Sequence, residues 1–183
     1  MLDNIRAHSL QVARVAVMLT HELLQVEVDV VTPGSTAPGA CVPTLDVDLV
    51  TAGALLHDIA KTQCLNGACS HAEVGGAICS GLGFAEVAVI VMQHVILADY
   101  NRPVSEIDVV YYADKRVRHD EIVTLDERQV YIEDRYGQGV QEIIDAIRLN
   151  FGKCYDVEKR IFSSLPFAPD DVADQVELRC FPF

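Results

Sequence analysis

The chain has 183 residues, a length that suits one domain or one domain with a small appendage. Half of its residues are hydrophobic and tryptophan is absent, so a core packed mainly by aliphatic side chains is available. The formal net charge of −13, from 14 Lys and Arg against 27 Asp and Glu, argues against a long nucleic acid as a general partner. A small phosphorylated compound remains compatible with this charge, because metal ions and a few local basic residues can offset it.

The longest apolar run, from Val87 to Met92, is far too short to span a bilayer. The N-terminus lacks a basic region followed by an apolar stretch and a cleavage site. We therefore expect a cytoplasmic protein with no membrane partner.

Cysteine spacing gives no CxxC pair, so reduced thiols are the simplest expectation for all six cysteines. Cys64 and Cys69 flank the sequence Leu-Asn-Gly-Ala, and for this pair a bridge or a shared metal is the alternative. The six positions are Cys41, Cys64, Cys69, Cys79, Cys154 and Cys180.

The pattern of apolar residues predicts an all-α chain. Residues 3–29 are typical of one amphipathic or mostly apolar helix. Residues 32–44 hold three prolines and two glycines and predict a loop. A second helix is expected at about 47–61, with Thr44 or Asp46 as its N-cap.

A loop with Asn66-Gly67 as its turn is expected at 63–70, followed by a third helix at about 70–80. Residues 84–98 predict a fourth helix that is apolar nearly all round and therefore buried. The Val-rich stretch 87–91 also suits a buried strand, but length and the neighbouring helical pattern favour helix.

A fifth helix is expected at about 106–119, with Ser105 as its N-cap. Two more helices are expected at 124–136 and 138–151, and a last one at 153–164. Residues 166–183 carry three prolines and suggest an irregular tail, in which 169–179 suits a short helix. We accordingly expect a helical domain over residues 1–150 and an extension over 151–183 that packs on it.

Several polar residues stand in apolar surroundings. His57 and Asp58 end the apolar run of residues 52–56, and burying that carboxylate is costly unless it is paired or binds a metal. His8, His94 and Asp114 lie in similarly apolar segments. A divalent metal that activates water needs neutral imidazoles and carboxylates on rigid elements, so these residues are candidate ligands.

Taken singly, most of these residues have a simpler explanation. A lone buried histidine such as His94 is more often a hydrogen-bonded core residue than a ligand, and Asp114 with its basic neighbours would suit a solvated helix face. For His71, at a helix start, the two interpretations are evenly balanced. The adjacent pair His57-Asp58 favours a ligand, because a core role leaves the carboxylate unexplained. A purely helical scaffold whose polar residues are all satisfied is the remaining alternative.

The order His, then His-Asp, then a distant Asp resembles the HD superfamily of metal-dependent phosphohydrolases. The resemblance implies the HD-domain helical bundle and maps one metal onto His8, His57, Asp58 and Asp114. Some HD enzymes carry two further histidines that bind a second metal, and these map onto His71 and His94. Asp58 would then bridge the two ions.

The chain resembles in particular the small bacterial YqeK-like HD proteins, which include dinucleoside tetraphosphate hydrolases that use two metals. The matching motifs lie within residues 5–120. The segment after His94 departs from the pattern, because that group tends to have Thr and Gly where this chain has Val95-Ile96-Leu97. The motifs are His57-Asp58-Ile59-Ala60-Lys61, His71-Ala72-Glu73-Val74-Gly75-Gly76 and Ala113-Asp114-Lys115.

The resemblance implies hydrolysis of a phosphoester or phosphoanhydride in a nucleotide or similar small compound, by a metal-activated water. We expect two divalent ions, with iron or manganese favoured over magnesium, nickel or zinc. Asp58 and Lys61 are the expected catalytic residues, and Lys61 and Arg118 the expected substrate contacts. The alternative is a catalytically silent HD module that binds or senses a nucleotide. Nothing in the sequence fixes the oligomeric state, and a homodimer is allowed.

Overall fold

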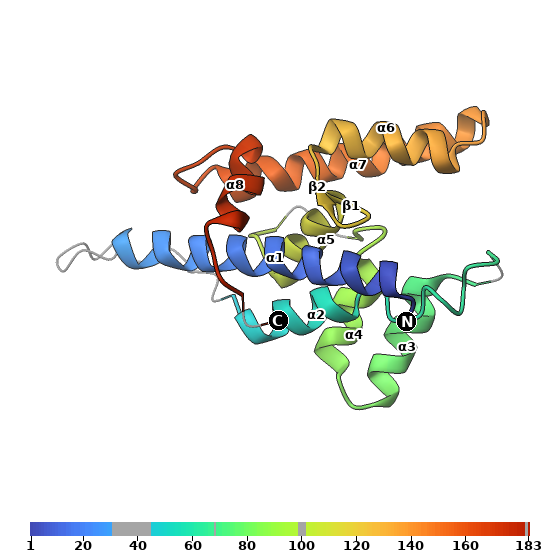
Figure 1. Cartoon of the computed structure of the whole chain (residues 1–183), viewed down its shortest axis with the longest axis horizontal. Coiled ribbons are helices and arrows are strands. Elements are labelled where there is room, and N and C mark those ends of the chain that lie inside the picture. Colours follow the sequence, from blue (N-terminus) through green and yellow to red (C-terminus); the bar gives the residue numbers. More distant parts are fainter. Residues whose placement is uncertain (31–44, 68, 99–101, 182) are drawn as a thin grey trace.

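The computed structural model describes residues 1–30, 45–67, 69–98, 102–181 and 183, and these residues form a helical bundle with one two-stranded sheet (Figure 1). The all-α prediction is therefore confirmed. The expected loop at 32–44 and the alternative cap Thr44 lie outside the described residues. The elements are α1 Asp3–Val30, α2 Val47–Leu56, α3 His71–Gly81, α4 Ala85–Gln93, α5 Glu106–Lys115, β1 Val117–Arg118, β2 Glu121–Ile122, α6 Leu125–Tyr136, α7 Gln141–Phe162, a 3-10 turn at Pro169–Asp171, and α8 Val172–Glu177.

Helix starts agree with the capping residues in the sequence. Asp46 caps α2, where its carboxylate accepts from the backbone N–H groups of Asp48 and Leu49 at 2.9 and 3.0 Å. Ser105 caps α5 in a capping box with Asp108. The predicted caps Asp46 and Ser105 are thus confirmed.

The second and the fourth expected helix both end earlier than predicted, and both ends supply site residues. The second helix stops at Leu56, so residues 57–61 form turns closed by i to i+3 bonds rather than a last helical turn. The fourth stops at Gln93, one residue before His94. Its expected all-round burial is also wrong, because Val89 and Met92 are exposed on its outer side.

The helices expected at 138–151 and 153–164 are one continuous helix, α7. Phe151, Cys154, Val157 and Ile161 form an unbroken buried stripe along it, and this packing outweighs the cost of about 1 kcal/mol that Gly152 brings to a helix interior. Residue 150, where a domain boundary was expected, lies inside this helix.

The end of α5 differs most from the prediction. The helix stops at Lys115 instead of near 119, and the chain turns into an antiparallel hairpin in which Val117 pairs with Ile122 and Arg118 with Glu121. His119 takes a positive φ of 58° in the two-residue turn, a conformation typical of tight hairpins. No alternating pattern in so short a segment could have indicated these strands.

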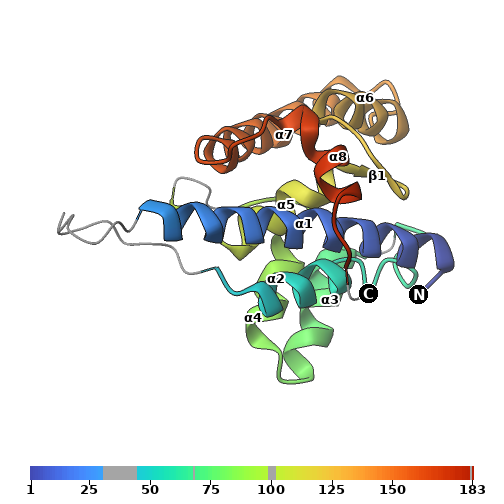
Figure 2. The same ribbon diagram turned by 60° about the vertical axis from the view of Figure 1, so that its left-hand side comes forward.

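The helices form three groups around α1 (Figures 1 and 2). Helices α2 and α5 pack against α1, α3 and α4 form a pair on one side, and the hairpin of α6 and α7 lies on the other. Helix α8 returns to α1. Within the described residues, no helix combines the length and the apolar character that a membrane crossing needs.

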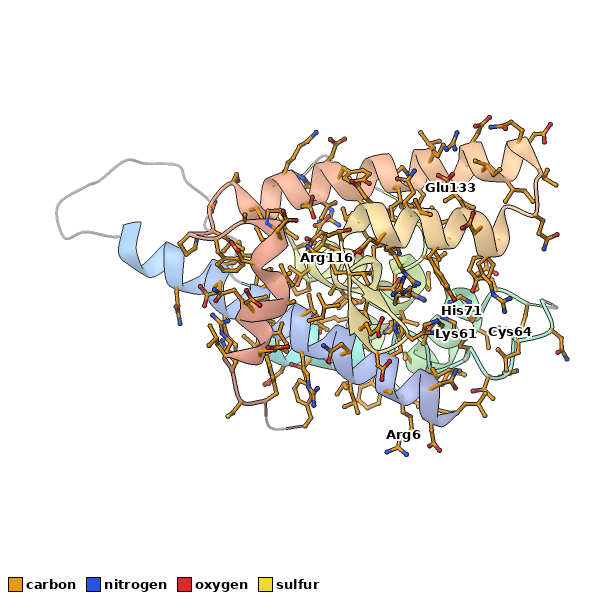
Figure 3. All side chains as sticks on the ribbon, turned by 45° about the horizontal axis from the view of Figure 1, so that its top comes forward. Arg6, Lys61, Cys64, His71, Arg116 and Glu133 are labelled. Carbon is orange, nitrogen blue, oxygen red and sulfur yellow. A yellow bond between two sulfur atoms is a disulfide. The ribbon has the colours of Figure 1, made fainter. Side chains whose placement is uncertain are left out.

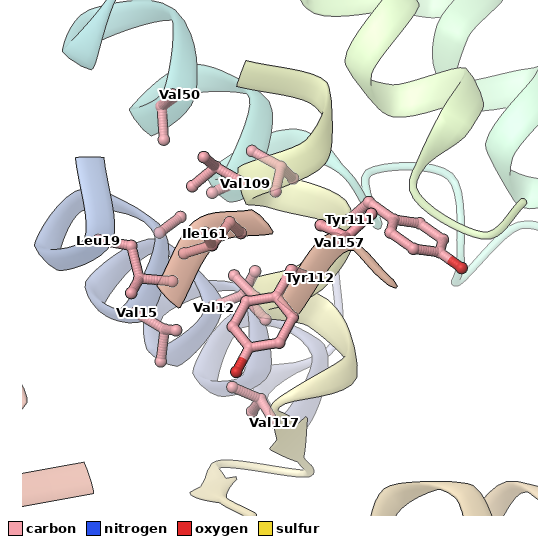
Figure 4. Packing of buried hydrophobic residues seen from close by; sticks show 14 of the residues in the cluster. Val12, Val15, Leu19, Val50, Val109, Tyr111, Tyr112, Val117, Val157 and Ile161 are labelled. Atoms are coloured by element: carbon pink, nitrogen blue, oxygen red, sulfur yellow. The ribbon is translucent and has the colours of Figure 1, made fainter. Parts of the chain in front are cut away.

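One continuous hydrophobic core joins α1, α2, α5 and α7 (Figure 4). Val12 and Leu19 of α1 face Val109 of α5, and Ile161 of α7 lies beside them. Because α5 is surrounded by the core, its polar residues near the C-terminal end are held in fixed positions, and those residues form part of the site.

Cys64 and Cys69 are joined by a disulfide. The expectation of six reduced thiols is therefore wrong for this pair, and the bridge that was the alternative is present. The bridge closes the loop between Lys61 and His71, two residues that the sequence assigns to the site.

Candidate metal centre

The fold brings the six predicted ligands to one place from five helices. His8 lies in α1, His57 and Asp58 follow the end of α2, and His71 is the first residue of α3. His94 follows the end of α4, and Asp114 lies in the last turn of α5. Figure 3 shows His71 and Lys61 beside each other, below α6.

One half of the centre contains His8, His57, Asp58 and Asp114. The ring Nε2 of His8 lies 3.0 Å from Oδ1 of Asp114, and Nε2 of His57 lies 3.6 Å from the same oxygen. The Nε2 atom of His57 is also 3.5 Å from Oδ2 of Asp58. His8, His57 and Asp58 each offer one atom within 4.8 Å of the others, a spacing that a single metal ion can bridge.

The other half contains Asp58, His71 and His94. Oδ1 of Asp58 lies 3.2 Å from Nε2 of His71 and 3.5 Å from Nε2 of His94. The two Nε2 atoms are 3.1 Å apart. The Asp58 carboxylate therefore faces both groups, with Oδ2 toward His57 and Oδ1 toward His71 and His94.

Backbone carbonyls orient three of the four imidazoles. Nδ1 of His57 donates to the carbonyl of Ala54 at 2.7 Å, and Nδ1 of His94 donates to that of Val91 at 2.6 Å. Nδ1 of His8 donates to the carbonyl of His119 at 2.8 Å. Since a carbonyl can only accept, each neutral ring carries its proton on Nδ1 and points the Nε2 lone pair into the centre.

Among the residues that the structure describes, two buried atoms of the centre lack a hydrogen-bond partner, namely Nε2 of His57 and Oδ1 of Asp58. His57 is 0% exposed and Asp58 only 1%. Buried polar atoms are normally satisfied, so this convergence of imidazole lone pairs and carboxylates is expensive in a protein without a cation. The donor set, nitrogen and oxygen with no thiolate, fits divalent transition metals.

The electrostatics of the centre also favour a cation. Burial would lower the pKa of His57, but Asp58 and Asp114 raise it. Burial would raise the pKa of both carboxyls, but the charge of His57 lowers that of Asp58 and the charge of Lys115 lowers that of Asp114. Burial, opposed by Asp58, lowers the pKa of His94 to about 4, so this ring is neutral at pH 7 and available as a ligand.

The sequence model of the HD domain family matches residues 5–136, which is well over half of the chain. The chain belongs to the HD domain family. No curated protein and no solved structure matches it. The family match ends at the last residue of α6, so the metal-ligand pattern lies within it and α7 lies beyond it.

Lysines stand on both sides of this HD centre. Nζ of Lys61 is 2.6 Å from Oδ2 of Asp58. Burial would lower the pKa of Lys61, but the charges of Asp58 and Asp114 raise it above its usual value. Nζ of Lys115 lies 3.1 Å from Oδ2 of Asp114 and also donates to the carbonyl of His94. Lys115 thus links α5 to the end of α4 and fixes the positions of two candidate ligands relative to each other. The motif Ala113-Asp114-Lys115 was recognised in the sequence, but the sequence alone assigned no role to Lys115.

A cavity of about 570 Å³ opens next to the centre. Its wall includes Lys61, His71, His94 and Asp114. This volume lies within the range of about 300–1,000 Å³ that is common for small-molecule sites. The cavity therefore gives a small compound access to the candidate ligands.

Arg118 does not lie where the sequence placed it. The expectation assumed that α5 continued to residue 119, which would have put Arg118 one turn beyond Asp114. Because the helix ends at Lys115, Arg118 instead lies in β1, where it pairs with Glu121 at 3.0 Å. It is not among the residues that line the cavity, whereas Arg128 of α6 is. Arg128 follows Asp126 and Glu127 in a polar helix, and no sequence signal separated it from an ordinary surface arginine.

Proposed function

We propose that this HD domain is a phosphohydrolase that cleaves a phosphoester or phosphoanhydride bond of a nucleotide or similar small phosphorylated compound. The observation that carries the proposal is the buried Asp58 carboxylate, which is shared by two clusters of imidazole nitrogens. Such a shared carboxylate is typical of two-metal hydrolytic sites.

His8, His57, Asp58 and Asp114 would hold one divalent ion, and Asp58, His71 and His94 the second. The absence of thiolate among these side chains favours iron or manganese, with nickel, zinc or magnesium as alternatives. Divalent ions bound there would supply Lewis acidity toward phosphate oxygens and a lower pKa for water.

Lys61 is the proposed catalytic and substrate-contacting lysine. Its ammonium group is held against Asp58 and its side chain is 34% exposed, so it can reach a phosphate oxygen in the cavity while it stays next to the centre. A charge-assisted hydrogen bond from this group would stabilise the negative charge that develops on the leaving oxygen.

A nucleotide suits the cavity by size and by charge. The volume of about 570 Å³ accommodates a compound of that class, and three cationic residues line the wall: Lys61, Lys115 and Arg128. The likeness of the HDxxK and ADK motifs to YqeK-like proteins supports the same substrate class.

The test uses two histidines of the same helix. His8→Ala removes a proposed ligand, whereas His21→Ala changes an exposed histidine of α1 that is far from the centre. We expect the wild type, purified anaerobically, to contain more than one transition-metal ion per chain and to hydrolyse at least one member of a nucleotide and phosphoester panel. His8→Ala should lose both properties, and His21→Ala should keep both.

The opposite result would reject the proposal. Wild-type protein with less than one ion per chain after anaerobic purification would exclude the two-metal centre. Tight nucleotide binding without turnover across the whole panel would instead support the silent HD module.

A further inference from the structure

One face of helix α6 forms part of the cavity wall. Arg128, Ile132 and Tyr136 are spaced four residues apart and therefore lie along a single helix face. Tyr136, at the end of this face, lines the same cavity as Lys61, which lies next to the centre. Helix α7, which lies outside the matched HD region, adds Ile143 and Ile147 to the same wall.

The three cations of the cavity differ in their partners. Lys61 is paired with Asp58, and Lys115 is paired with Asp114. Arg128 has no carboxylate within 4 Å among the residues that the structure describes, and its Nε is buried without a hydrogen-bond partner. Its guanidinium carbon lies 5.5 Å from the ring centre of Tyr131, a stacking contact that leaves the in-plane donors free.

The acidic neighbours of Arg128 are engaged elsewhere. The Glu127 carboxylate accepts from the backbone N–H of Thr124 at 2.8 Å, as part of the α6 capping box. The Asp126 carboxylate accepts from the hydroxyl of Tyr155. An arginine that stays unpaired at the start of such an acidic helix, and that lines a cavity, is suited to an anion from outside the protein.

We propose that Arg128 binds a second anionic group of the substrate, one that is not cleaved, while the apolar side chains beside it cover the organic part. Ile132, Ile143 and Ile147 supply this apolar cover. The proposal rests on the phosphohydrolase function above and narrows its substrate class to organic phosphates with a second acidic group. That group is a phosphate or a carboxylate, because the guanidinium fork binds both in the same way.

Arg118 provides a matched control variant. It is an arginine ten positions earlier, but it lies in β1, pairs with Glu121 and does not line the cavity. Arg128→Gln removes the charge and the fork, Arg128→Lys keeps only the charge, and Arg118→Gln removes a charge outside the cavity. Thermal unfolding of each variant shows whether it is folded before binding is measured.

The experiment measures the binding of three non-hydrolysable probes to manganese-loaded protein by calorimetry. Propylphosphonate carries one anionic group, 3-phosphonopropionate adds a carboxylate at the same chain length, and ethane-1,2-diphosphonate adds a second phosphonate. We expect Arg128→Gln to weaken the binding of one or both of the two-anion probes about tenfold or more, the size of a lost charge-assisted contact. Propylphosphonate binding should change less than about twofold, Arg128→Lys should be intermediate, and Arg118→Gln should match the wild type. The probe that loses more affinity identifies the second group as a phosphate or a carboxylate.

Equal weakening of all three probes by Arg128→Gln would overturn the proposal, because it would indicate a general charge effect. Unchanged binding of all three probes in a folded Arg128→Gln variant would also overturn it. Both results leave the hydrolytic function standing if the wild type still turns over a phosphate compound. A wild type that binds no probe and hydrolyses no phosphate would overturn the proposed function and, with it, the role of Arg128.

Discussion

Asp58→Asn is the substitution that separates a metal centre from a polar core most sharply. The change keeps the size of a side chain that is 1% exposed and removes only its charge. Asp58 faces His57 on one side and His71 and His94 on the other, so an amide there cannot serve both groups as an anionic bridge. We therefore expect both halves of the centre to lose metal, although only one residue has changed.

The expected magnitudes follow from burial and from the contacts. Loss of a residue that only orients a ligand lowers metal affinity about 10- to 100-fold, so loss of a shared ligand should lower it more than about 100-fold. Stability of the metal-free protein should fall by only about 2 kcal/mol, below the roughly 3–5 kcal/mol of a broken buried pair. The reason is that the side chain of the partner Lys61 is 34% exposed, so its ammonium group can turn toward water.

Asp108→Asn is the matched control. Asp108 is also buried, at 0% exposure, but it pairs with Arg102 and Arg160 away from the centre. Its arginine partners are also partly exposed, so it should likewise lose about 2 kcal/mol of stability, but it should keep its full metal content. The assays are elemental analysis of the purified proteins and urea unfolding with and without a chelator. Full metal occupancy in Asp58→Asn, or equal metal loss in both variants, would refute the assignment of Asp58.

Three further predictions concern other parts of the site. Lys61→Met should lower kcat about 10- to 100-fold with unchanged metal content, as measured by steady-state kinetics on the best substrate, and an unchanged kcat would exclude the catalytic role. The pKa of His94 is about 4 in the folded chain and 6.5 in the unfolded chain, so in metal-free protein its imidazole should remain neutral at about pH 5 by NMR. For the same reason, the free energy of unfolding should fall as the pH drops from 6.5 toward 4. Titration of His94 near 6.5 would contradict its burial. Reduction should release two more thiols, from Cys64 and Cys69, and lower stability by about 2 kcal/mol, whereas an unchanged thiol count would show that the bridge does not form in solution.

The helices and the candidate ligands could be predicted because their signals are local. The caps Asp46 and Ser105 lie next to apolar runs, and the polar pair His57-Asp58 directly follows a hydrophobic segment. A buried carboxylate has few explanations, so the sequence alone singled out the residue that the structure places between two histidine clusters.

The rest depends on contacts between distant segments, which a single sequence does not show. The proton position of His8 is set by the carbonyl of His119, a residue whose side chain gave no signal. Arg118 was expected in the cavity because the predicted helix α5 was one turn too long. Arg128 was not predicted, because only the packing of α6 brings it to the cavity wall. Helix α7 continues through Gly152, where a break was predicted, because its buried stripe is stabilised by the core.

Crystals grown with manganese and measured at an anomalous wavelength show most directly whether these six side chains bind two ions. We predict two anomalous peaks about 3.5–4 Å apart on either side of the Asp58 carboxylate, one next to His8, His57 and Asp114 and the other next to His71 and His94. Well-ordered crystals with full side-chain density at these residues and no anomalous peak among them would contradict the account.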